Sequence, residues 1–99
     1  MTTFAELRRA ARRRDILLLA SESGRVGCSD ELLALGLEGR GVGAARDAIA
    51  IDVAWLAEQG LVRTTESDGQ RVVIITQRGD DVARGLADVP GVARPGLGG

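Results

Sequence analysis

The chain has 99 residues, 44% of them hydrophobic and 27% charged, with a formal net charge of −1, which predicts one small globular domain. No apolar run approaches the ~18 residues of a membrane span, and no secretory signal pattern follows the N-terminal arginines, so we expect a cytoplasmic protein. The single cysteine, Cys28, excludes an internal disulfide, and the absence of histidine excludes catalysis or zinc binding through that residue.

The first predicted helix begins at Thr3, because Thr3 and Glu6 match a capping box, and it ends in the segment 21–24. Its apolar residues recur at roughly helical spacing and are expected to make core or dimer contacts: Phe4, Leu7 and Leu18. Arginines cover most of the other side: Arg8, Arg9, Arg12, Arg13 and Arg14. They predict a solvated face with Arg–Asp or Arg–Glu pairs, with a supporting phosphate contact as the alternative.

Two further helices are predicted before the first strand. One begins at Ser29, whose hydroxyl can accept a hydrogen bond from the first turn, and stops in the glycine-rich segment 39–43. Its inward residues are expected to be Leu32, Leu33 and Leu37. The next helix runs from Ala44 or Ala45 to Gln59, and no side chain before it offers a cap. Its inward stripe follows i, i+4, i+7 spacing: Ile49, Val53 and Leu56.

Two short strands are predicted over residues 61–66 and 71–76, and the Asp68-Gly69 pair between them is a hairpin turn signal. Thr76 then caps a fourth helix over residues 77–87, in which Val82 and Leu86 are spaced i, i+4. Prolines and glycines dominate the remaining segment. We therefore expect a domain over residues 1–88 and a flexible C-terminal tail over residues 89–99.

The predicted order is helix, helix, helix, strand, strand, helix, which is a mainly α arrangement with a small β-hairpin, as in a winged helix-turn-helix. The segment 53–63 contains Leu56-x-x-x-Gly60-Leu61-Val62 and resembles the end of the recognition helix in ArsR-, MarR- and PadR-type regulators. Thr76-Gln77-Arg78-Gly79 resembles the Thr-x-x-Gly segment that begins their last helix. These resemblances imply that the third helix is the recognition helix and the hairpin the wing.

The whole chain also resembles the small winged-helix proteins of Mu-like phages and prophages. The matching features are Arg46-Asp47, the segment 54–62, Thr76-x-Arg78-Gly79 and the tail pattern Val89-Pro90-Gly91-Val92-x-Arg94-Pro95. This resemblance implies a DNA-binding protein of a mobile element. The Cys-x-Cys and His/Asp clusters of ArsR-type metal sensors are absent from the sequence, so no sensed metal is expected.

The predicted DNA contacts lie on three segments. Helix three presents Arg46, Asp47 and Ala50 outward, and Arg46 suits a guanine or a phosphate. Asp47 and Asp52 would repel the DNA backbone unless they pair with arginines. The wing residues suit a phosphate or a narrow minor groove, with pairing to Glu66 or Asp68 as the alternative: Arg63, Gln70 and Arg71. Arg40, in the turn before helix three, is a further predicted phosphate contact.

Two other side chains are expected to have structural roles. Trp55 is expected to anchor the core or an interface, and Cys28 is expected to be a small, semi-buried residue rather than a redox sensor. The paired acids Asp30-Glu31 and Asp80-Asp81 stand at helix starts, where the helix dipole explains them. We therefore expect no enzyme activity, cofactor, metal or small-molecule ligand.

The sequence thus predicts a transcription regulator of phage or prophage type that binds double-stranded DNA as a homodimer. Its charges are asymmetric, with six arginines against three acidic residues in positions 1–27 and seven against eleven in the rest. The alternative is a winged-helix module that binds a protein of a phage replication, transposition or assembly complex. The net charge of −1 and the few polar residues on helix three favour that alternative.

Overall fold

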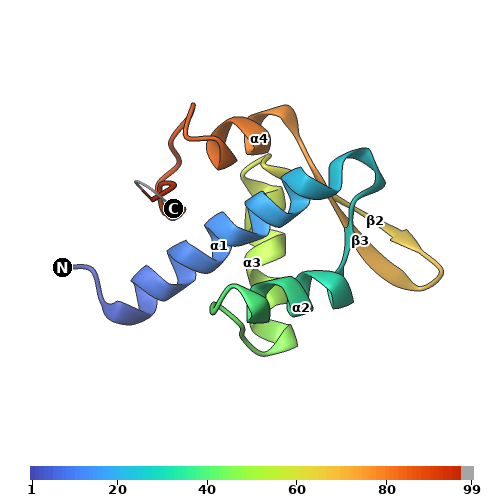
Figure 1. Ribbon diagram of the computed structural model, residues 1–99, viewed down its shortest axis with the longest axis horizontal. Coiled ribbons are helices and arrows are strands. Elements are labelled where there is room, and N and C mark those ends of the chain that lie inside the picture. Colours follow the sequence, from blue (N-terminus) through green and yellow to red (C-terminus); the bar gives the residue numbers. More distant parts are fainter. Residues whose placement is uncertain (97–99) are drawn as a thin grey trace.

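The computed structural model describes residues 1–96, which form a mainly helical domain with a small antiparallel sheet (Figure 1). In chain order the elements are α1 (Phe4–Ser23), the short 3₁₀ helix η1 (Gly24–Val26), β1 (Cys28–Ser29), α2 (Asp30–Gly39), α3 (Arg46–Glu58), β2 (Val62–Ser67), β3 (Gln70–Ile75) and α4 (Gln77–Ala83). The predicted order of four helices and a hairpin is confirmed. The sequence did not predict β1 or η1, because such short segments carry no periodicity.

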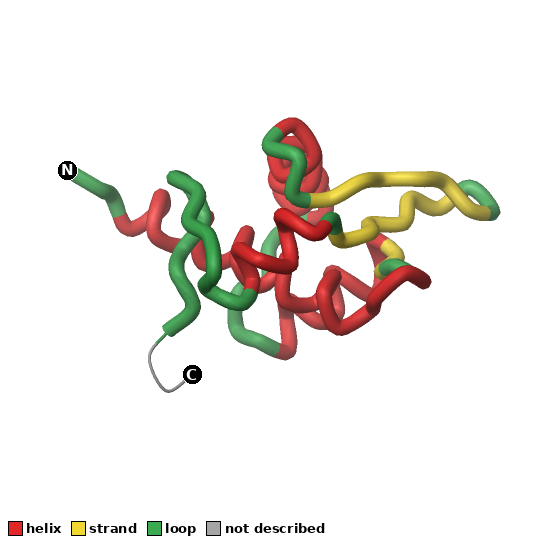
Figure 2. Tube along the Cα trace, turned by 90° about the horizontal axis from the view of Figure 1, so that it is seen from above, coloured by secondary structure: helices red, strands yellow, loops and turns green. Residues whose placement is uncertain are grey.

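The sheet has the strand order β1-β3-β2, and both pairings are antiparallel. The predicted hairpin turn is confirmed, because Asp68 and Gly69 both have positive φ, at 53° and 76°, as a two-residue hairpin turn of this hand requires. In Figure 2 the hairpin extends away from the helices, at the opposite end of the molecule from the N-terminus. The domain is elongated, with extents of 42 × 27 × 25 Å.

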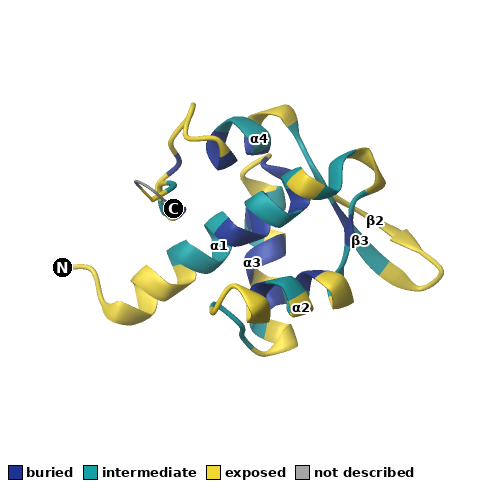
Figure 3. Ribbon diagram, in the orientation of Figure 1, coloured by how far each residue is buried: buried dark blue, intermediate teal, exposed yellow. Residues whose placement is uncertain are grey.

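The core lies where α1 crosses α3, and α2, α4 and the sheet close around it (Figure 3). The predicted inward stripe of α3 is confirmed, since Ile49, Val53 and Leu56 are all buried. The continuous apolar run in α1 is also confirmed as core, with Ile16 and Leu17 fully buried. The inward set predicted for α2 is wrong at one position, because Leu33 and Leu37 are buried whereas Leu32 is exposed.

Hydroxyl caps begin the helices α1, α2 and α4 at the predicted positions. The Thr3, Ser29 and Thr76 hydroxyl oxygens accept hydrogen bonds from the N–H groups of Glu6, Leu32 and Gly79, at 3.0 to 3.1 Å. These caps satisfy donors that the first helical turn leaves unpaired. The helix α3 begins after Ala45 without a side-chain cap, as its sequence predicts.

Two predictions near the C-terminus are corrected. The helix α4 ends at Ala83 rather than near residue 87, so Leu86 does not continue the stripe of Val82 and is exposed. Residues 89–96 do not extend freely from the domain. Val89 and Val92 are buried, and the Ala93 N–H donates to the carbonyl oxygen of Ala10 in α1 at 3.1 Å. The burial of these two valines therefore holds the predicted tail against the domain. Residues 97–99 of the predicted tail lie outside the described part.

Within residues 1–96, no helix has the length and apolar character needed to cross a membrane.

Candidate nucleic-acid interface

The exposed side of α3 carries the residues predicted to meet DNA. Arg46 and Asp47 are exposed in the first turn, and Ala50 is half-buried one turn later. The Asp47 carboxylate accepts a hydrogen bond from the Ala48 N–H at 2.9 Å, which ties that side chain to the helix start. Ile51 is also exposed, at 67%. Arg46 is therefore the side chain of this turn that can donate hydrogen bonds to a base edge or a phosphate.

The hairpin does not gather its three predicted contacts at one place. Arg63 is paired with Ile74 at the base of the hairpin, whereas Gln70 is paired with Ser67 at its tip. Side chains alternate between the two faces of a strand, so Gln70 and Ile74 share a face and Arg71 points to the other. Arg63 and Gln70 are exposed, and Arg71 is half-buried.

Arg71 and Arg40 are held by carboxylates of the domain. The Arg71 Nε donates to Asp30 of α2 at 3.1 Å rather than to Glu66 or Asp68 across the strands. The Arg40 Nε lies 3.3 Å from the carboxylate of Asp15 in α1. A phosphate contact by either arginine would compete with an existing ion pair.

Two aspartates are buried beneath the arginine run of α1. Asp52 of α3 is 1% exposed, and its carboxylate accepts hydrogen bonds from the Nε groups of Arg12 and Arg13 at 2.5 and 3.0 Å. Asp15 is 2% exposed and accepts from the Nε of Arg14 at 3.1 Å as well as from Arg40. The predicted Arg–Asp pairs are confirmed, but three of these arginines point inward and do not form a solvated face. Asp52 consequently contributes no exposed negative charge to α3.

Trp55 anchors the contact between α1, α3 and the C-terminal segment. The Arg13 guanidinium lies over the indole ring, 3.9 Å from its centroid. Its Nη1 also donates to the carbonyl oxygen of Gly91 at 3.3 Å. A Cβ atom at Gly91 would lie 2.9 Å from the indole, so the segment passes close to the ring. The prediction of Trp55 as a structural anchor is confirmed.

A groove between α2 and α3 lies beside the start of α3. Its cavity of about 500 Å³ is lined by Glu31, Ala34, Leu35, Glu38, Gly43, Ala44 and Arg46. Two glutamates thus flank the arginine that is the predicted base contact. The acidic lining disfavours binding of a phosphate inside this groove.

Cys28 is buried in the core, more deeply than the semi-buried position that the sequence predicts. Desolvation by burial raises the pKa of its thiol, and the nearby negative charge of Asp30 raises that pKa further, while a hydrogen bond with Ser23 lowers it. The thiol is therefore protonated at neutral pH and a poor nucleophile. Among residues 1–96, no group of three or more His, Cys, Asp or Glu side chains could hold a metal ion.

The fold defines this protein as a mainly helical domain with a three-stranded antiparallel sheet. The chain is 46% identical to "Uncharacterized protein gp26" of Escherichia phage Mu over an aligned segment of 59 residues. This aligned segment covers 60% of the chain. The chain spans 62% of the length of that curated relative. This similarity supports a phage association. No protein-family model matches the chain, and no solved structure matches it.

Proposed function

We propose that this protein is a winged helix-turn-helix transcription regulator of phage or prophage type that binds double-stranded DNA. In this assignment α2 and α3 are the helix-turn-helix, α3 enters the major groove, and the hairpin β2–β3 is the wing. The order of the elements, the hairpin that extends from the helical body (Figure 1) and the similarity to a phage Mu protein support the proposal.

The observation that carries the proposal is the distribution of ion pairs among the arginines. Within residues 1–96, seven of the thirteen arginines pair with aspartates: Arg12, Arg13, Arg14, Arg40, Arg71, Arg84 and Arg94. Arg46 on α3 and Arg63 on β2 are exposed, and neither forms an ion pair in this described part of the chain. Arg8, Arg9, Arg25 and Arg78 are also exposed without an ion pair in that part, and of these six arginines Arg46 and Arg63 are the two that stand on the elements assigned to DNA.

Replacing Arg46 with alanine tests the proposal. We expect Arg46→Ala to weaken duplex binding about tenfold, since a good arginine contact to a base contributes ~1–3 kcal/mol. The affinity is measured by fluorescence anisotropy with a labelled duplex of about 24 bp at several salt concentrations. The matched control is Arg94→Ala, which removes the same charge from an arginine already paired with Asp88. Equal affinities of the wild type and Arg46→Ala would exclude α3 as the reading helix.

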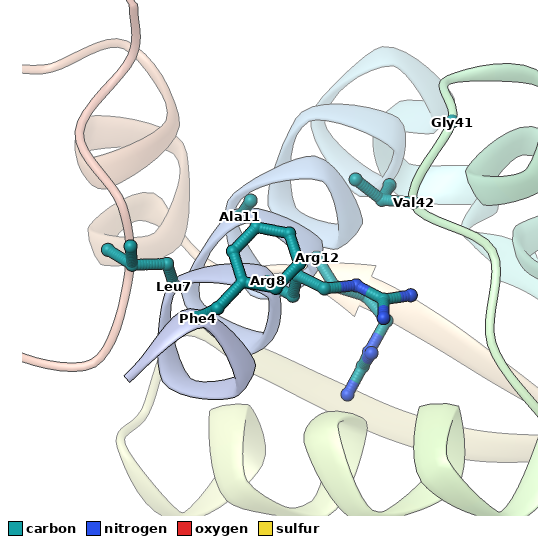
Figure 4. A pocket seen from close by; sticks show the side chains of 7 residues that line it. All are labelled: Phe4, Leu7, Arg8, Ala11, Arg12, Gly41 and Val42. Carbon is teal, nitrogen blue, oxygen red and sulfur yellow. The ribbon is translucent and has the colours of Figure 1, made fainter. Parts of the chain in front are cut away.

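A homodimer is proposed from the exposed start of α1. All residues from Met1 to Arg9 are exposed, and Phe4 and Leu7 are 73% and 56% exposed. These two side chains line a cavity of about 280 Å³ together with Arg8, Ala11, Arg12, Gly41 and Val42 (Figure 4). The sequence predicts these residues as core or dimer contacts, and the structure excludes the core. A second copy of α1 would cover their apolar surface.

The double variant Phe4→Glu/Leu7→Glu is expected to be a monomer, because four carboxylates would face one another across the proposed interface. Sedimentation velocity of the wild type and of the variant measures the mass. Both sites are exposed in the monomer, so the helical circular dichroism signal is expected to be nearly unchanged. A monomeric wild type at micromolar concentration would contradict the homodimer.

One observation favours a second function, the binding of a protein partner. The exposed side of α3 includes Ile51, and the adjoining groove between α2 and α3 has the exposed Leu35 beside Glu31 and Glu38. An apolar surface rimmed by acids suits a basic amphipathic segment of another protein better than DNA. Absence of duplex binding even at low salt would favour this function.

A further inference from the structure

Another groove lies between η1 and the hairpin. Two arginines line it, and no residue of α3 does. It is lined by Gly24, Arg25, Arg63, Ile74 and Ile75 and encloses about 490 Å³. Arg25 belongs to η1 and Arg63 to β2, so two segments far apart in the sequence contribute one arginine each. The sequence alone indicates Arg63 but not Arg25, because it predicts only a short connection where η1 lies.

The backbone fixes η1 against one face of the hairpin. Gly27, directly after η1, has φ 83°, and a Cβ atom there would lie 2.5 Å from Val72 Cγ1 and 3.0 Å from Ile74 Cγ1. Ile74 pairs with Arg63 in the ladder, so Arg63 lies on this same face. The close approach of Gly27 thereby sets Arg25 beside Arg63.

The charges of this groove differ from those of the groove between α2 and α3. Among the described residues, no acidic side chain lines it, whereas Glu31 and Glu38 line the other. Within residues 1–96, Arg25 and Arg63 form no ion pair, and both are exposed. The lining thus combines two arginines with two isoleucines, and a planar guanidinium can bind the oxygens of a phosphate with two parallel hydrogen bonds.

We propose that the Arg25–Arg63 groove binds phosphate groups of the DNA backbone, at a position separate from the contacts of α3. This inference rests on the proposed DNA binding and adds a second contact to it. Arg46 stands in the first turn of the 13-residue helix α3, which is about 20 Å long, whereas Arg63 stands on β2, after the other end of that helix. The groove shares no lining residue with the surface at Arg46, so in this proposal it engages other phosphates and lengthens the contact along the duplex.

The salt dependence of binding measures this contact. Each phosphate neutralised on B-DNA contributes ~0.9 to the slope of log affinity against log salt. With the same duplex, Arg25→Ala is expected to reduce the magnitude of this negative slope by about 0.9. The double variant Arg25→Ala/Arg63→Ala is expected to reduce it by up to about 1.8. Arg94→Ala removes one charge, as Arg25→Ala does, and is the control for that variant; its slope is expected to match that of the wild type. Slopes that are equal in the wild type and the double variant would overturn the inference.

Nuclear magnetic resonance of the full chain separates this inference from the proposed function. The Nε–H signals of Arg25, Arg46 and Arg63 are followed while the same unlabelled duplex is added at low salt. Movement of the Arg25 and Arg63 signals supports the groove. Movement of Arg46 alone would retain DNA binding through α3 and overturn the groove. Movement of Arg25 and Arg63 without Arg46 would retain the groove and remove α3 from the interface, and no movement at all would overturn both.

Discussion

Replacing Asp52 with asparagine is expected to lower the free energy of unfolding by about 3 kcal/mol, as for other buried ion pairs that lose one partner. The Asp52 carboxylate is buried between the guanidinium groups of Arg12 and Arg13, which are themselves only 13% and 12% exposed. The Asp52→Asn substitution keeps the shape of the side chain but removes its negative charge. The two arginines would then repel each other without compensation in a region that water reaches poorly.

Urea denaturation followed by circular dichroism measures this loss. Asp47→Asn is the matched control, because Asp47 belongs to the same helix but is exposed and forms no ion pair within residues 1–96. Its effect is expected to be within about 0.5 kcal/mol, as for most surface substitutions. An Asp52→Asn protein as stable as this control would show that the pair contributes no net stability.

Replacing Gly79 with alanine is expected to destabilise the protein by about 3 kcal/mol or more, although alanine is normally the better helix former. A Cβ atom at position 79 would lie 1.9 Å from the carbonyl oxygen of Leu61 and 2.8 Å from Ile75 Cδ1. The first of these is a backbone atom that cannot rotate away. The helix α4 would have to move off the start of β2, which also strains the hydrogen bond from the Thr76 hydroxyl to the carbonyl oxygen of Gly60.

The control for this prediction is Gly39→Ala in α2, where a Cβ atom would meet nothing within 4 Å. That variant is expected to gain roughly 0.5 kcal/mol through lower backbone entropy of the unfolded chain. Thermal denaturation of both variants gives the comparison. Stabilisation by both substitutions would mean that α4 moves freely enough to accept a methyl group against β2.

Much of the fold follows from local signals in the sequence. The caps Thr3, Ser29 and Thr76 and the Asp68-Gly69 turn each act within four residues, so they are readable without knowing the tertiary structure. The short strand β1 exists only through its pairing with β3, since Cys28 lies opposite Val73. Nothing within residues 28–29 specifies that partner, so the sequence could not reveal the third strand.

The buried charges were only partly predictable. Asp52 falls on the same face of α3 as Ile49 and Leu56, at i+3 from one and i−4 from the other. A charge inside an apolar stripe signals a buried partner, and the sequence carries this signal. Which arginines supply the partner depends on how α1 crosses α3, at a separation of 39 or 40 positions. The same limit applies to Arg25, whose neighbour Arg63 is brought near by the fold alone.

The candidate DNA residues divide in a way that charge counting could not show. Arg40 and Arg71 form ion pairs with Asp15 of α1 and Asp30 of α2. Arg46 and Arg63 have the same side chain but form no ion pair within residues 1–96. The proposed interface therefore depends on which arginines the domain leaves unpaired, and that property is set by tertiary contacts.

If the protein binds DNA as proposed, the ion pairs of Arg12 and Arg13 with Asp52 affect the spacing of the half-sites in its operator. These ion pairs hold α1 against α3, so they fix the proposed dimer contact at the start of α1 relative to the proposed reading helix α3. In such a dimer the distance between the two copies of α3 is set by the length and tilt of α1. The spacing of the two half-sites on the DNA would then be specified by a helix that never touches a base.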